Sequence, residues 1–121
     1  MTLTTEQALG LWLGPLTVMV RAEGNDLSAR QTAVLVRVYV EPPPHTVRGL
    51  AAALRLSKPA ISRALDTLGR RGMIRRAADP RDKRSIVVQR TVKGSVYLRE
   101  LADAIALAAD ALSSPEPDRP G

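Results

Sequence analysis

Basic and hydroxyl side chains share one face of a helix that apolar spacing predicts over residues 58–71. Lys58, Ser62 and Arg63 lie on that face near its N-terminal end, and the apolar side chains lie on the opposite face. An arginine in this position can donate two hydrogen bonds to the edge of a guanine, and lysine and serine can bind bases or phosphates. The pattern predicts a helix that contacts the major groove of DNA, with a plain solvated face as the alternative.

A second basic cluster follows in a segment rich in turn-forming residues. Arg81, Lys83 and Arg84 lie between two runs of strand-forming residues, so we expect them at the tip of a β-hairpin. An arginine on such a tip can enter a narrow minor groove, where negative potential is concentrated. We expect Asp82 to stabilise the tip instead, either by pairing with Arg84 or by accepting hydrogen bonds from tip amides.

The positive charge of the chain is concentrated in its centre. The formal net charge is +6, and residues 46–94 hold thirteen of the eighteen Lys and Arg against three acidic residues. The flanking segments, 1–45 and 95–121, each carry more acidic than basic residues. A basic block with acidic flanks is typical of a protein that binds a polyanion, although a soluble basic surface has the same composition.

The composition argues against several other kinds of site. Without cysteine the chain has no disulfide or thiolate ligand, and a single histidine, His45, cannot form a multi-histidine metal site. We expect His45 to be a surface residue. No apolar run approaches the ~20 residues of a membrane span, and the first residues lack the basic segment of a secretory signal. No histidine, cysteine or glycine-rich loop accompanies the carboxylates at catalytic spacing, so we expect no enzyme, no metal and no cofactor.

The elements around the two basic clusters follow the order of a winged helix-turn-helix. Apolar spacing predicts helices over 28–40, 47–54 and 58–71. Hydroxyl residues precede each helix as N-caps: Ser28, Thr46 and Ser57. Gly72 fits the left-handed position after the third helix, and strands at 73–77 and 85–90 complete the hairpin. We therefore expect a mainly α fold with a small β-hairpin, in which the third helix enters the major groove.

Further helices are predicted at both ends, over 5–23 and 94–112. Pro15 should kink or divide the first of them, because it removes a backbone hydrogen bond. One face of the first helix and a heptad seam of the last are apolar, and we expect the two helices to pack together: Leu9, Leu13, Leu16 and Val20; Leu98, Leu101, Ile105, Ala108 and Leu112. Residues 1–112 are expected to form a single domain with a core at 27–94, followed by a disordered tail at 113–121.

Six central segments share the order and spacing of a known family. They are LSARQTAVL at 27–35, VRGLAAAL at 47–54, SKPAISRALDTL at 57–68, GMIRR at 72–76, DPRDKR at 79–84 and TVKG at 91–94. Together they resemble the MarR family of bacterial transcriptional regulators. The resemblance implies a homodimer that binds a near-palindromic operator. Many members of the family release DNA when a small aromatic or phenolic effector binds. The resemblance also matches Asp82 and Arg84 to an aspartate–x–arginine pair whose arginine enters the minor groove.

From these patterns and the resemblance we predict a sequence-specific regulator of transcription that binds double-stranded DNA as a dimeric repressor. The helices at 5–23 and 94–112 would form the dimerisation region, and the protein would act in the bacterial cytoplasm, at the nucleoid when bound. The alternative is a winged-helix module that binds a protein partner, or DNA without sequence preference, and has no effector. The residues predicted to contact DNA are Thr46, Ser57, Lys58, Pro59, Ser62, Arg63, Thr67, Arg70, Arg81, Lys83 and Arg84.

Overall fold

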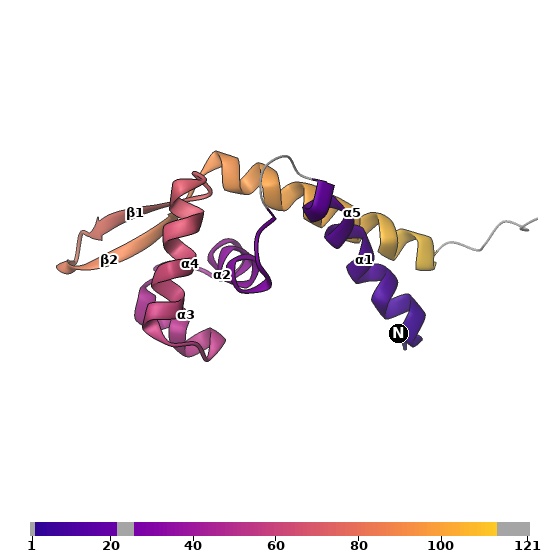
Figure 1. Ribbon diagram of the computed structural model, residues 1–121, viewed down its shortest axis with the longest axis horizontal. Helices are drawn as coiled ribbons and strands as arrows, with labels where there is room; N and C mark the ends of the chain where they lie inside the picture. The colour runs from indigo at the N-terminus through magenta and orange to yellow at the C-terminus, as the bar shows by residue number, and fades with distance from the viewer. Residues whose placement is uncertain (1, 22–25, 114–121) are drawn as a thin grey trace, which may run out of the picture. The chain divides into compact units, whose positions relative to one another are not determined.

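The computed structural model describes residues 2–21 and 26–113, which form five helices and one two-stranded antiparallel sheet (Figure 1). The mainly α fold with one hairpin is therefore confirmed. The chain divides into a central unit, Leu27–Tyr97, and a terminal unit made of the remaining residues. The elements in order are α1 (Thr5–Arg21), α2 (Ala29–Val40), α3 (Val47–Leu54), α4 (Lys58–Arg70), β1 (Ile74–Asp79), β2 (Asp82–Arg90) and α5 (Val92–Ser113).

The three helices of the central unit begin at the hydroxyl residues that the sequence predicts as N-caps. The Ser28 hydroxyl accepts a hydrogen bond from the Gln31 amide (3.1 Å), and the Gln31 side chain accepts one from the Ser28 amide (2.9 Å), which forms a capping box. Thr46 and Ser57 cap α3 and α4 through their hydroxyls. A cap of this kind contributes about 1 kcal/mol, which helps α2 stay helical despite its β-branched residues.

The core of the central unit is aliphatic and lies where α2, α3 and α4 meet. Its fully buried large side chains are Val34, Leu35, Val38, Ile61, Leu65 and Leu68. The turn between α3 and α4 passes through Arg55 at φ 55°, and the turn after α4 passes through Gly72 at φ 73°, the left-handed conformation that favours glycine. Because one face of α4 is buried in this core, the opposite face is exposed to solvent.

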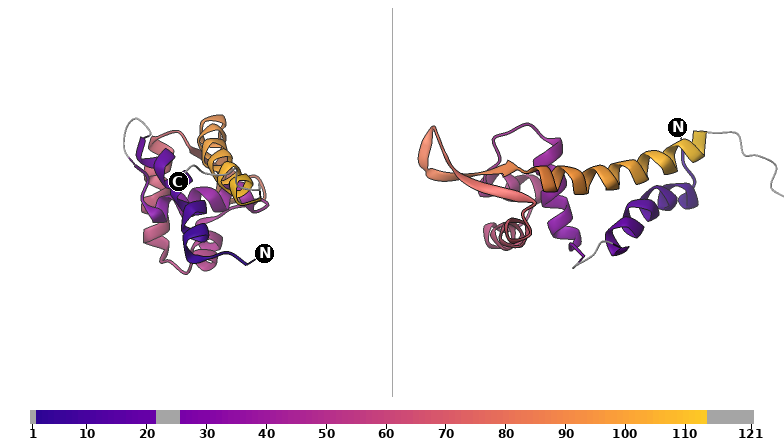
Figure 2. Two further views of the ribbon diagram at one scale, coloured as in Figure 1. Left: turned by 90° about the vertical axis from the view of Figure 1, so that its right-hand side faces the viewer. Right: turned by 90° about the horizontal axis from the view of Figure 1, so that it is seen from above.

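The hairpin is more regular than the sequence predicts. Pairing runs from Ile74 with Arg90 to Ala78 with Ile86, shifts register there, and continues with Asp79 opposite Asp82. Only residues 80 and 81 remain between the strands, so the predicted loop over 78–84 was wrong for five of its seven residues. Figure 2 shows the hairpin extending beyond the helices of the central unit.

The segment before α3 folds against the second strand. The carbonyl of His45 accepts a hydrogen bond from the Val88 amide (2.8 Å), and Thr46 forms an isolated bridge with Val87. The His45 side chain is buried, with its Nε2 3.1 Å from the Glu41 carbonyl oxygen, so the expectation of a surface histidine was wrong. The bridge fixes the start of α3 beside the hairpin.

The terminal unit contains α1 and most of α5. Helix α1 continues across Pro15, so the proline does not divide it. A Cβ added at Gly14 would lie 3.2 Å from the Ala104 carbonyl oxygen, so α1 and α5 approach each other closely at this point, although they do not pack extensively as expected. However, the buried residues of α1 are Pro15 and Met19, while the predicted inner face is largely exposed. That assignment of the buried face was wrong.

The ends of the predicted elements fall partly outside the described residues. Helix α5 includes Ser113, which the sequence assigned to a disordered tail. The rest of that predicted tail, 114–121, and positions 22 and 23 of the predicted first helix lie outside the described residues. Within the described ranges, none of the helices is long and apolar enough to cross a membrane.

Candidate nucleic-acid interface

The outer face of α4 presents the side chains that the sequence assigns to the major groove. Lys58 and Arg63 are exposed, and Ser62 is half-buried, on the side opposite the core residues of α4. No partner for the Arg63 guanidinium lies among the described residues, so its donors face solvent. Such a helix presents free donors at its N-terminal half, which is the geometry that base contacts in a major groove need.

The remaining predicted contacts on the helices are partly occupied by the fold itself. The hydroxyls of Thr46 and Ser57 accept amide hydrogen bonds as N-caps, and Pro59 occupies the first turn of α4. Further along α4, Arg70 Nη2 donates to the Thr67 hydroxyl (3.3 Å). This hydrogen bond holds the Arg70 guanidinium against α4, beside the Thr67 hydroxyl.

Two carboxylates organise the tip of the hairpin. One oxygen of Asp82 accepts from the Arg84 amide (3.1 Å), and the other accepts from the Ser85 hydroxyl (3.1 Å). Asp79 accepts from the Arg81 amide (2.9 Å) in the same way. Among the described residues Asp82 forms no ion pair with Arg84, so of the two expectations for Asp82 the structure contains the amide contact. The side chains of Arg81, Lys83 and Arg84 are left exposed.

If this tip enters the minor groove of DNA, an Asp82→Ala variant should bind a duplex about 3- to 10-fold more weakly, because each lost tip hydrogen bond contributes about 0.5–1.5 kcal/mol to holding Arg84 in place. Fluorescence anisotropy with a labelled duplex would measure the change. Asp82→Asn, which keeps an acceptor oxygen, should bind nearly as tightly as the unaltered protein. If Asp82 only repelled phosphates, Asp82→Ala would bind more tightly, and that result would contradict the structural role.

A cross-element ion pair links the hairpin to α4, and the sequence analysis missed it. Arg76 Nη2 lies 2.8 Å from Asp66 Oδ1 and 3.2 Å from the Ser62 carbonyl oxygen, so β1 is tied to the outer face of α4. Both side chains are partly exposed, which limits such a pair to about 1 kcal/mol. The ion pair contributes mainly to the position of the hairpin, because it holds β1 against α4. The only sign of this ion pair in the sequence was that opposite charges lie on either side of the Gly72 turn, at Asp66 and Arg76.

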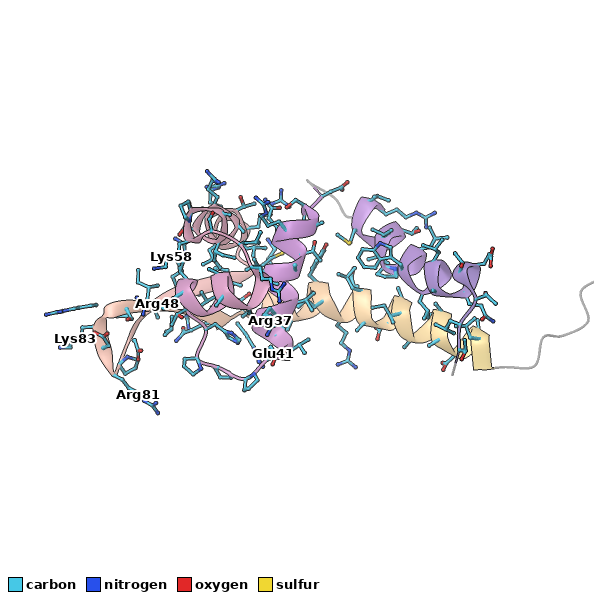
Figure 3. All side chains as sticks on the ribbon, turned by 90° about the horizontal axis from the view of Figure 1, so that it is seen from below. Arg37, Glu41, Arg48, Lys58, Arg81 and Lys83 are labelled. Carbon is cyan, nitrogen blue, oxygen red and sulfur yellow. The ribbon has the colours of Figure 1, made fainter. Side chains whose placement is uncertain are left out.

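Further cations widen the basic surface beyond the predicted set. Figure 3 shows Arg48 on α3, and in this projection it lies between Lys58 and the hairpin residues Arg81 and Lys83. An open groove of about 730 Å³ runs between the N-terminal turn of α2 and α4, and Arg30 and Arg63 both line it. Neither Arg30 nor Arg48 belongs to the recognition-helix pattern, so spacing along the chain did not single them out.

Together the exposed face of α4 and the ordered hairpin define a winged helix-turn-helix DNA-binding protein. Residues 27–86 match the model of the MarR family. The chain belongs to the MarR family and is a DNA-binding regulator of transcription.

Solved structures of transcriptional regulators share this fold. The PcaV transcriptional regulator from Streptomyces coelicolor, in complex with its natural ligand, is 28% identical, with 88% of this chain and 71% of PcaV covered and a TM-score of 0.62. MepR of S. aureus in a DNA complex is 20% identical over 88% of this chain and 75% of MepR, with a TM-score of 0.71. The transcriptional repressor CouR, bound to a 23-mer DNA duplex, is 24% identical over 90% of this chain and 75% of CouR, with a TM-score of 0.67.

Proposed function

We propose that this protein is a sequence-specific repressor that binds a pseudo-palindromic operator as a homodimer. The exposed outer face of α4, beside a hairpin whose tip Asp82 organises, is the observation that carries the proposal. Lys58, Ser62 and Arg63 would contact the major groove, and Arg84 would enter the minor groove. MepR and CouR, which are both solved with DNA, support operator binding by this chain as well.

The homodimer would be formed by the terminal helices. Four large apolar side chains of α1 are exposed in the single chain, and a second copy would cover them: Leu9, Trp12, Leu13 and Val20. Residues 1–112 would then work as one domain, with 27–94 as the DNA-binding core and 5–23 and 94–112 as the dimerisation helices. Two copies related by a twofold axis would present two α4 helices to major grooves about 34 Å apart.

Selection from a random pool of duplexes tests the proposal directly. We expect a motif with twofold symmetry to be enriched, and binding to it should weaken by about 10³-fold or more between 50 and 200 mM salt, because six or more phosphate contacts displace counterions. Equal affinity for all sequences would overturn the repressor proposal and leave a module that binds DNA without specificity. Failure to bind any duplex at low salt would point to a protein partner instead.

The mode of action follows from the same site. We propose that the protein acts by binding rather than by catalysis, in the cytoplasm of a bacterium and at its nucleoid when bound to DNA. PcaV is solved with its natural ligand, which supports a small-molecule effector for this chain also. A thermal-shift screen of aromatic acids, followed by operator competition, would identify such an effector.

A further inference from the structure

One tyrosine hydroxyl holds the junction between the hairpin and α5. The Tyr39 hydroxyl, on α2, accepts a hydrogen bond from the Thr91 amide (2.8 Å). It also lies 2.8 Å from the Thr91 carbonyl oxygen and 3.0 Å from the Met73 carbonyl oxygen, which share its single proton. Thr91 is the residue between β2 and α5, and Met73 is the residue before β1. One side chain therefore connects α2 to both ends of the hairpin.

Thr91 and Gly94 complete this junction. The Thr91 hydroxyl donates to the Gly72 carbonyl (2.7 Å) and accepts from the Gly94 amide (3.1 Å), so it caps α5 while binding the turn after α4. Gly94 leaves no room for a side chain, because an added Cβ would overlap the Tyr39 hydroxyl and the Met73 carbonyl. The first turn of α5 is thus pressed directly against this tyrosine.

Arg90 closes the junction from the other side. Its Nε donates to the Val38 carbonyl and its Nη2 to the Glu41 carbonyl, both at 3.0 Å, and its guanidinium lies 5.7 Å from the centre of the Tyr39 ring. A cation at the C-terminal end of α2 is favoured by the helix dipole and by the aromatic ring. We call Tyr39, Arg90, Thr91 and Gly94 the latch. It fixes the first turn of α5 relative to α2, the hairpin and the turn after α4.

We propose that the latch determines the spacing between operator half-sites that the protein accepts; this rests on the proposed binding of a palindrome by a dimer. Helix α5 has 22 residues and a rise of about 33 Å, so a tilt of about 5° at its first turn displaces its far end by about 3 Å. That displacement is close to the rise of ~3.4 Å per base pair. If the terminal helices join the two copies, the angle of α5 at the latch sets the distance between the two α4 helices.

The test uses duplexes that carry two copies of the selected half-site, with the distance between their centres changed by one or two base pairs. The unaltered protein should prefer one spacing by about 10-fold or more over spacings two base pairs away. Tyr39→Phe removes only the hydroxyl and should reduce that preference to below about 3-fold, while affinity for a duplex with a single half-site changes less than about 2-fold. A purely structural role would lower both affinities together and leave the preference unchanged.

Matched variants separate the latch from general stability. Thr32→Val removes a buried hydroxyl of the same helix whose hydrogen bond, to the Ser28 carbonyl (2.9 Å), stays at the start of α2, so its spacing profile should match that of the unaltered protein. Thr91→Val should broaden the profile and Thr91→Ser should restore it, which gives a second test if Tyr39→Phe does not fold.

Three results would decide the question. A sharp spacing preference that survives in both Tyr39→Phe and Thr91→Val overturns the latch and leaves the dimeric repressor intact. An unaltered protein that prefers no spacing overturns the proposed binding mode itself. Broadened profiles in both variants, with single half-site binding retained, support the latch.

Discussion

Operator affinity of an Arg63→Ala variant is expected to fall by a factor of about 5 to 150 for each half-site, because a bidentate contact between arginine and guanine discriminates by about 1–3 kcal/mol. Arg63 is exposed on the outer face of α4 and its donors are free among the described residues. The preference at one base-pair position in each half-site should relax at the same time. Anisotropy titrations of the operator and of single-base-pair variants, at one fixed salt concentration, measure both effects.

Alanine variants of two other arginines serve as controls for Arg63→Ala. Arg99→Ala removes the same charge from an exposed position in the terminal unit and should leave the base preference unchanged. Arg70→Ala should weaken binding to all sequences about equally and reduce the salt slope by about 1, as expected for a phosphate contact. An Arg63→Ala variant that keeps the full base preference would show that α4 does not contact bases through this residue.

The helices of the central unit were predictable because their signals are local. A hydroxyl N-cap such as Ser28 or Ser57 acts within four residues, and a stripe of apolar residues at helical spacing identifies the buried face of α4. Once that face is known, the exposure of Lys58 and Arg63 follows without further information. The exposed face of α4 was therefore predictable from the sequence alone, whereas its contact with DNA stays a prediction.

The hairpin and the loop before α3 were harder to predict because their stability comes from pairing with distant residues. Asp79 and Asp82 are residue types that favour turns, yet each accepts a hydrogen bond from a backbone amide at the tip, and the strands continue almost to that tip. His45 is polar and follows three prolines, which suggests exposure, but its backbone pairs with Val88 and buries its ring. The Tyr39 contact with Thr91 joins residues 52 positions apart, beyond any local spacing rule.

Helix α1 shows what periodicity leaves undetermined. The spacing of Leu9, Leu13 and Val20 correctly identifies an apolar face, but it does not say what covers that face. In the single chain the helix instead buries Pro15 and Met19. The three predicted residues are 61%, 63% and 64% exposed, respectively. A face this apolar and this exposed is better explained by contact with a second copy than by solvent.

Replacing Leu13 by glutamate is therefore expected to convert the protein to a monomer and to lower operator affinity by about 10³-fold, because linking two binding sites raises affinity by about 10²–10⁴-fold. Light scattering after size exclusion measures the mass, and anisotropy measures the affinity. Leu13 is exposed in the single chain, so the monomer should keep its helices, which circular dichroism checks, while the melting temperature loses the part that dimerisation contributes.

The control for this variant carries the same kind of change outside the terminal helices. Val40→Glu places a carboxylate on a side chain of α2 that is also exposed, and it should leave the mass that of a dimer. A Leu13→Glu protein that stays dimeric with unchanged operator affinity would exclude this face of α1 from the interface. A monomer that still binds one half-site normally but has lost the operator would show that the central unit contacts DNA by itself, and that the terminal helices supply only the coupling between two copies.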